Sequence, residues 1–187
     1  MRATSAKTEP LLERLFELPD EAATERFGKS FAHALMTLYT TDFPGLQVHL
    51  YGELGMGKTA LVRATLRALG YTGRVRSPTY TLVEPYMLEV AKLVSSGATQ
   101  TLNSGFNLPL NIVHFDLYRF TDPTEWADAG FREYFNLRAL YLIEWPQQAG
   151  SLLGMPDLEF TLDLAGAGRR LLVRAFSQTG QECLARC

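Results

Sequence analysis

The chain has 187 residues, of which 47% are hydrophobic, and its formal net charge at pH 7 is −2. This size and apolar content suit one compact domain, and we expect a single domain over residues 1–187. A protein that grips nucleic acid by itself usually carries a basic stripe, which this sequence lacks. No apolar run approaches the length of a membrane helix and residues 1–10 do not resemble a secretory signal, so we expect a cytoplasmic protein without membrane contact.

The first half of the chain begins with residues 1–17, which we interpret as a flexible leader with at most a short helix near its end. An amphipathic helix is predicted over residues 20–38, because apolar side chains recur every three or four positions and Asp20 is a suitable N-cap. A strand follows at residues 46–51. After a glycine-rich turn, a second helix is predicted over residues 58–69.

The middle of the chain contains two predicted strands, residues 77–86 and residues 111–118, both with alternating apolar positions. The segment between them, residues 88–109, is rich in Ser, Thr, Gly and Asn. Loops of this length are uncommon inside compact domains. We therefore interpret it as an inserted loop, either a mobile flap or a short helix over residues 88–94 followed by disorder.

The last part of the chain has a helix start at Asp122, where a proline and a glutamate follow at favourable positions. Residues 139–144 are predicted to form a buried strand that ends in an acid. Two further strands, residues 158–164 and 171–176, are joined by a short turn and form an antiparallel hairpin. The order of these elements indicates one α/β domain.

One glycine-rich motif carries the chemistry, because residues 52–59 match the pattern G-x-x-x-x-G-K-[ST]. Its members are Gly52, Glu53, Leu54, Gly55, Met56, Gly57, Lys58 and Thr59. Small residues let the backbone wrap around phosphate with its N–H groups pointing inward, and the following helix adds the positive end of its dipole. In such a loop Lys58 reaches the β- and γ-phosphates, and the Thr59 hydroxyl ligates Mg²⁺.

Two acids suit the metal and the attacking water that such a loop requires. Glu144 ends one predicted strand, as a metal-binding acid of this class would, and Asp116 lies within another. We predict that both are catalytic and that Glu144 is also a metal ligand, while which of them orders the water stays open. Thr79 is either a switch residue that senses the γ-phosphate or a structural strand residue.

Three other residues are open to a structural interpretation. His49 and His114 alternate with apolar neighbours in predicted strands, which favours ordinary packing for both. Trp145 follows Glu144 directly and either shapes a lip over the nucleotide or belongs to the core.

A family resemblance is carried by four segments that occur in this order: GELGMGKT at 52–59, SPTYTLVEPY at 77–86, HFDLYR at 114–119 and IEWPQQ at 143–148. Together with LPDEAAT at 18–24, they resemble the bacterial TsaE (YjeE) family over about residues 18–176. The resemblance implies a three-layer α/β P-loop NTPase fold with a mixed central sheet and a C-terminal hairpin. It also implies a Mg²⁺-dependent ATPase of tRNA threonylcarbamoyladenosine (t6A) biosynthesis that binds ATP and ADP.

The same resemblance implies protein partners. TsaB and TsaD perform the carbamoyl transfer to adenosine 37, ATP hydrolysis resets their complex between turnovers, and tRNA is met only through that complex. Carried over by motif, Lys58 and the loop amides bind phosphate, and Thr59 and Glu144 ligate magnesium. Asp116 is then the essential acid and Thr79 the switch residue.

Two weaker assignments also come from the resemblance. The family resemblance implies that Glu21 lies near the base of the bound nucleotide and that the basic turn at Arg169 closes over this base. One feature departs from the family, whose members connect the two middle strands by a short turn where this chain has residues 88–109.

Three other functions fit parts of the sequence. A small GTPase would need an Asn-Lys-x-Asp guanine reader, which does not occur. A small-molecule kinase would need an arginine-bearing lid, and residues 88–109 contain Lys92 but no arginine. A nucleotide-gated scaffold that binds ATP and barely hydrolyses it remains the non-enzymatic alternative.

Overall fold

The computed structural model describes residues 8–40, 42–91 and 107–187. Its strands form one seven-stranded sheet in the order β1-β7-β6-β2-β5-β4-β3. The strands are β1 (Leu12–Leu18), β2 (Leu46–Tyr51), β3 (Val83–Ala91), β4 (Asn107–Asp116), β5 (Ala139–Glu144), β6 (Leu158–Ala165) and β7 (Gly168–Ala175). The helices are α1 (Glu21–Leu38), α2 (Lys58–Ala68), α3 (Thr124–Asp128) and α4 (Gln178–Leu184), with 3-10 helices η1 (Phe131–Asn136) and η2 (Pro146–Leu153).

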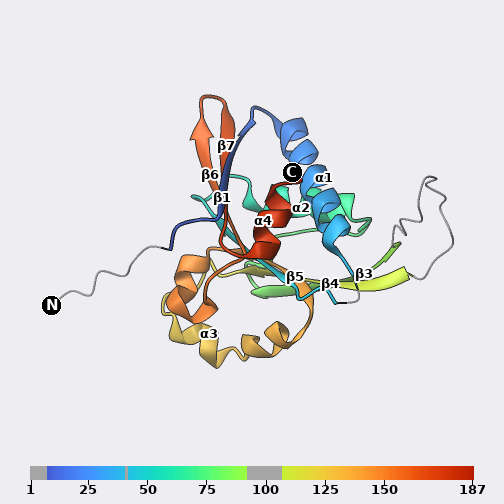
Figure 1. The fold of residues 1–187 in the computed structure, drawn as a ribbon. Helices are drawn as coiled ribbons and strands as arrows, with labels where there is room; N and C mark the ends of the chain where they lie inside the picture. The colour runs from blue at the N-terminus through green and yellow to red at the C-terminus, as the bar shows by residue number, and fades with distance from the viewer. Residues whose placement is uncertain (1–7, 41, 92–106) are drawn as a thin grey trace.

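The sheet is the middle of three layers (Figure 1). Helices α1, α2 and α4 cover one face, and α3 with the two 3-10 helices covers the other. The neighbouring strands β6, β2, β5 and β4 run parallel, while β1, β7 and β3 join by antiparallel pairing. The expected three-layer fold, the mixed sheet and the C-terminal hairpin β6–β7 are confirmed.

The central strands are apolar enough to be covered on both faces. All six residues of β5 are buried, as expected for a parallel strand between two helical layers. The parallel strands β2, β5 and β4 all end at the same edge of the sheet. The loops that follow them therefore meet there.

Helix α1 begins as its sequence predicts. The Asp20 side chain accepts a hydrogen bond of 2.7 Å from the Ala23 backbone N–H, an N-cap interaction that stabilises a helix by about 1 kcal/mol. Phe27 and Phe31, on the inner face of the helix, both pack against Phe160 of β6. These contacts hold α1 over the sheet.

The expected flexible leader is wrong for residues 12–17, which belong to edge strand β1. This strand pairs antiparallel with β7 along its whole length, and the Phe16 ring packs on Phe27 at 4.8 Å between centroids. Charged residues interrupt the apolar alternation of β1. Its strand conformation therefore depends on pairing with β7 rather than on the local sequence pattern. Residues 1–7 lie outside the described residues.

The inserted loop is shorter than expected. Strand β3 continues to Ala91 and β4 begins at Asn107, with these two residues opposite each other in the antiparallel register. Both interpretations, the mobile flap and the short helix over residues 88–94, are therefore wrong for residues 88–91, because Leu88 and Val90 are buried as strand residues. Residues 92–106 lie outside the described part of the chain. The start of β3 is also later than predicted, at Val83.

The C-terminal helix α4 has no counterpart among the predicted elements. Its N-cap is Ser177, whose hydroxyl accepts a 3.0 Å hydrogen bond from the Gly180 N–H. Cys183 on this helix is buried against the α1 layer.

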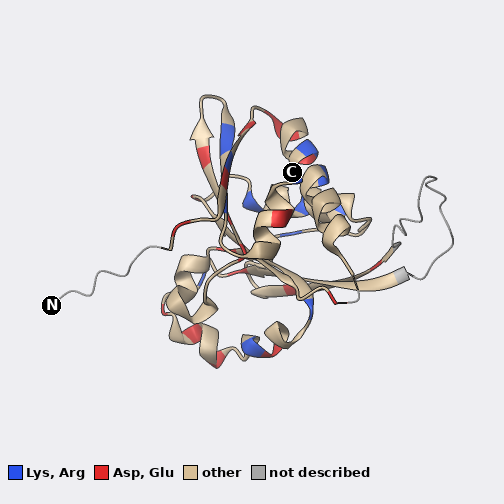
Figure 2. Ribbon diagram, in the orientation of Figure 1, with Lys and Arg blue, Asp and Glu red and all other residues tan. Residues whose placement is uncertain are grey.

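Charged side chains are distributed over the sheet and both helical layers, with basic and acidic residues interspersed along the ribbon (Figure 2). The near-balanced pattern agrees with the net charge of −2. Within the described residues, no helix has both the length and the apolar character to cross a membrane.

Candidate phosphate and metal site

The predicted site residues gather at the edge where β2, β4 and β5 end. Residues 52–57 follow β2 and lead into α2, while Asp116 and Glu144 are the last residues of β4 and β5. These two acids are direct neighbours in the parallel register. Open α/β sheets commonly bind ligands outside the carboxyl ends of their parallel strands.

The glycines of the loop are required by its backbone. Gly52 has φ +138°, and a Cβ there would lie 2.7 Å from the Leu162 carbonyl oxygen. Gly57 has φ +99° and is the N-cap of α2. Side chains other than hydrogen would strain both positions, so the loop keeps its tight turn directly before the helix N-terminus.

Lys58 is buried in the loop, with only 3% of its surface exposed. Its ammonium donates hydrogen bonds of 2.5 Å to the Gly52 carbonyl and 3.0 Å to the Glu53 carbonyl. Nζ also lies 3.9 Å from the ring centroid of Trp145. Burial lowers the pKa of Lys58, while the charges of Glu144, Asp116 and Glu53 act in the opposite direction.

Thr59 and Glu144 are joined across the site. The Thr59 hydroxyl lies 2.8 Å from Glu144 Oε1 and 3.1 Å from Oε2, and it donates to this carboxylate. Glu144 is 2% exposed. Its Oε1 also lies 2.9 Å from Nε2 of His114.

Asp116 organises a second group of hydroxyls. Its Oδ2 accepts a hydrogen bond of 2.8 Å from the Thr79 hydroxyl and another from the Ser77 hydroxyl, and the two hydroxyl oxygens lie 2.5 Å apart. Its Oδ1 accepts from the Tyr118 N–H at 3.1 Å. The segment that contains Thr79 is thus tied to the end of β4, although Thr79 precedes β3 and is not part of a strand.

Arg169 reaches the loop from β7. Its guanidinium donates to the Met56 carbonyl at 2.9 Å and to the Gly55 carbonyl at 3.4 Å. Glu21 lies further away, at the first turn of α1, and lines a cavity of about 260 Å³ between α1 and α2 together with Ala60. Glu21 is therefore near the start of α2 but outside the network of Lys58 and the acids.

Sequence reasoning missed two residues of this arrangement and left the role of a third, Trp145, open. His114 was assigned to packing, yet it contacts Glu144; Ser77 was not singled out, yet it contacts Asp116. Trp145 has φ +59°, and its half-buried ring contacts both Lys58 and the Tyr118 ring. The alternation of strand β4 could have identified His114, because residues two apart face the same side of a strand and Asp116 lies two positions further on.

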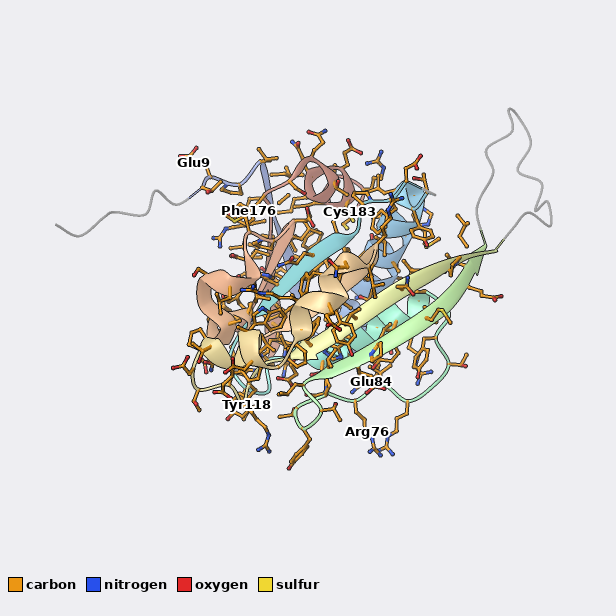
Figure 3. All side chains as sticks on the ribbon, turned by 90° about the horizontal axis from the view of Figure 1, so that it is seen from below. Glu9, Arg76, Glu84, Tyr118, Phe176 and Cys183 are labelled. Atoms are coloured by element: carbon orange, nitrogen blue, oxygen red, sulfur yellow. The ribbon has the colours of Figure 1, made fainter. Side chains whose placement is uncertain are left out.

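The border of the site is exposed and partly aromatic. Tyr80 is 85% exposed, and the Arg119 guanidinium lies 4.3 Å from its ring centroid. Arg76 and Glu84 line an adjoining cavity of about 520 Å³ together with Tyr80. Figure 3 shows Arg76, Glu84 and Tyr118 along the same edge of the molecule.

The residues of the site fit a phosphate ligand and a hard cation. No cluster of three His, Cys, Asp or Glu side chains that could hold a metal alone occurs among the described residues. The site instead combines one hydroxyl with two carboxylates, and oxygen donors of this kind suit Mg²⁺ when phosphate oxygens and water complete its coordination. The glycine turn and Lys58 supply the phosphate-binding groups.

The fold and this arrangement define a three-layer α/β protein of the P-loop NTPase fold. The sequence model of the family described as threonylcarbamoyl adenosine biosynthesis protein TsaE matches residues 18–172. The chain therefore belongs to the TsaE family.

Similar proteins agree with this membership. The tRNA threonylcarbamoyladenosine biosynthesis protein TsaE of Haemophilus influenzae is 36% identical, over 89% of this chain and 92% of the relative. The protein of the same name from Rickettsia typhi is 32% identical, over 82% and 89%. A crystal structure of YdiB from Bacillus subtilis has the same fold, with a TM-score of 0.63, 22% identity and 93% coverage of each chain.

Proposed function

We propose that this chain binds ATP and ADP with Mg²⁺ and hydrolyses ATP in support of t6A formation on tRNA. In this proposal it acts in the cytoplasm with TsaB and TsaD, and it meets tRNA only through their complex. The observation that carries the nucleotide part is the contact between Thr59 and Glu144 directly beside the buried Lys58.

Phosphate binding would use the loop after β2. Lys58 already lies inside the turn, held by two loop carbonyls and the Trp145 ring. Because these partners are neutral, the ammonium keeps its positive charge available for an anion. The N-terminus of α2 adds backbone N–H groups and the positive end of the helix dipole.

Magnesium would be held by Thr59 and Glu144, with Asp116 beside them. A bound Mg²⁺ would supply charge neutralisation for the phosphates. Glu144 is oriented by two hydrogen-bond donors, and Asp116 by two hydroxyls and a backbone N–H. Fixed carboxylates of this kind can position a metal ligand or an attacking water without reorganisation.

Thr79 is suited to a switch role. Its hydroxyl bonds Asp116, while the next residue, Tyr80, is almost fully exposed. A movement of Asp116 would therefore shift Thr79 and, with it, the exposed neighbouring residue Tyr80. The exposed Tyr80 with Arg119 makes this border a suitable contact for a protein partner such as TsaD.

Calorimetric titration tests the nucleotide part. We expect ATP and ADP to bind with Mg²⁺ more tightly than GTP. Lys58→Ala should weaken ADP binding by about 10- to 100-fold, the usual cost of a lost hydrogen bond to a charged group. Equal or tighter binding of GTP, or unchanged affinity in the Lys58→Ala variant, would contradict the proposal.

Steady-state hydrolysis, measured for the chain alone and with TsaB and TsaD added, tests the catalytic part. Glu144→Gln and Asp116→Asn should lower turnover by about 10²- to 10³-fold while leaving most of the nucleotide affinity. Wild-type rates in both variants would remove the acids from the mechanism. Tight ATP binding without hydrolysis, even with both partners present, would favour the nucleotide-gated scaffold.

A further inference from the structure

We propose that His114 is a positioning residue, which holds the Glu144 carboxylate in the orientation that binds magnesium. The inference rests on the proposed nucleotide function and extends it to a side chain outside the motifs that carry the phosphate chemistry. His114 would not touch the nucleotide itself but would act through Glu144.

The geometry places one carboxylate oxygen between two donors. Glu144 Oε1 lies 2.9 Å from His114 Nε2 and 2.8 Å from Thr59 Oγ1. The two donors come from different elements, β4 and α2. His114 is fully buried and Glu144 nearly so, so water does not compete for the hydrogen bond between these two side chains.

The surroundings of the imidazole assign its proton. A carboxylate oxygen accepts hydrogen bonds, so the nitrogen facing Glu144 must carry the N–H. The other nitrogen, Nδ1, is buried and has no hydrogen-bond partner among the residues that the structure describes. A proton on Nδ1 alone would bury an unsatisfied N–H and leave the Nε2 lone pair facing the carboxylate, so the Nε2–H form is favoured.

This hydrogen bond matters because a glutamate side chain has three rotatable bonds. Thr59 alone could follow the carboxylate through several orientations, since its hydroxyl rotates. His114 cannot, because the ring belongs to a central strand and is enclosed by the core. Partners of metal-binding side chains commonly set metal affinity in this way.

A second buried histidine provides the matched control. His49 is 3% exposed on β2, a neighbour of β5, and its Nε2 lies 2.7 Å from the Gln47 amide nitrogen. It has the same size and similar burial, but its partner is an amide rather than Glu144. A purely structural role predicts similar effects from both histidines, whereas positioning predicts an effect from His114 alone.

The test compares His114→Leu, His114→Gln and His49→Leu, each with its folding checked by thermal melting. The affinity for ADP is measured by titration in EDTA and at increasing Mg²⁺. For His114→Leu we expect the Mg²⁺ concentration needed for half of the affinity increase to rise about 10-fold, with the affinity in EDTA unchanged. His114→Gln keeps an N–H donor near the position of Nε2 and should restore at least half of the effect in free-energy terms. His49→Leu should behave as the wild type.

A wild-type Mg²⁺ requirement in folded His114→Leu would overturn the inference, and so would an equal shift in His49→Leu. If the wild type binds no ADP at all, the proposed function itself fails, which is a different outcome.

A spectroscopic measurement needs no variant and covers the case in which His114→Leu does not fold. In ¹⁵N-histidine NMR of the wild type above pH 7, we expect Nε2 of His114 to be protonated. A ring protonated only at Nδ1 could not donate to Glu144 and would overturn the inference irrespective of nucleotide binding.

Discussion

The two faces of strand β4 carry opposite kinds of side chain. Val113 and Phe115 point into the aromatic layer around α3. His114 and Asp116 point to the side of α2, where His114 contacts Glu144 and Asp116 contacts Thr79. These four β4 residues are consecutive in sequence and all are buried. Because side chains alternate between the faces of a strand, a single segment serves both layers.

The two faces of β4 differ in role: the aromatic face stabilises the fold, and the polar face contributes to the candidate site. Around Phe115 the aromatic rings pack edge-to-face or stacked, and burial of their apolar surface stabilises the fold. On the opposite face, Lys58, His114, Asp116 and Glu144 are buried polar groups. Burying such groups is costly, and clusters of buried polar groups are typical of functional sites.

The two buried histidines follow the same division. His49, on the side of η2, faces Gln47, whose amide also donates to the Leu153 carbonyl at 3.1 Å. His114, on the side of α2, faces Glu144. The first interaction joins parts of the fold, and the second joins a strand to a proposed metal ligand.

The largest expected effect comes from the aromatic face. Phe115→Ala should lower the free energy of unfolding by about 3–5 kcal/mol, because the ring is fully buried among Trp126, Phe131 and Phe135. Urea unfolding measures the loss, and Phe115→Leu should lose less. At urea concentrations below its unfolding transition, the Phe115→Ala variant should bind MgADP with an affinity within about twofold of wild type. A large loss of affinity in a still folded variant would mean that the two faces are coupled.

A smaller effect should appear as a pH dependence of stability. Burial lowers the pKa of His49 from 6.5 to about 4, so between these values the unfolded chain binds a proton that the folded chain does not. The contribution of His49 to stability is therefore complete above pH 6.5 and is lost as the pH falls toward 4, by up to about 3 kcal/mol. Unfolding measured at pH 7.5 and 4.5 should show a smaller difference in His49→Leu than in the wild type. An identical pH dependence would show that His49 titrates normally.

The smallest effect should come from the far end of the β3–β4 ladder. Ala91 and Asn107 are opposite each other in the register, so an Asn-Gly turn in place of residues 92–106 can close the hairpin. Because closing a shorter loop costs less conformational entropy, stability should rise by up to about 2 kcal/mol, while the MgADP affinity should change by less than about 0.5 kcal/mol. Thermal melting and calorimetry check both. Failure of this variant to fold would show that the replaced residues contribute to the core.

Many parts of the fold follow from local pattern. The strands at Leu46–Tyr51 and Ala139–Glu144 have the predicted bounds, and α1 starts at the predicted N-cap. The glycine motif is located correctly because its backbone requirements are local. The edge strand β1 and helix α4 were missed, since β1 depends on pairing with β7, far away in the chain.

The site divides in the same way. The sequence by itself determined the family, the α/β class and the residues of the loop, because these depend on spacing within single segments. Only the tertiary structure decided that Thr59 meets Glu144, that Ser77 joins Thr79 on Asp116, and that His114 has a polar partner. Those contacts join residues 30 or more positions apart. The pairing of β4 with β5 brings His114 near Glu144, whereas Thr59 comes from α2 and the two hydroxyls of Ser77 and Thr79 come from the segment before β3. No pattern within a single segment predicts that these elements meet.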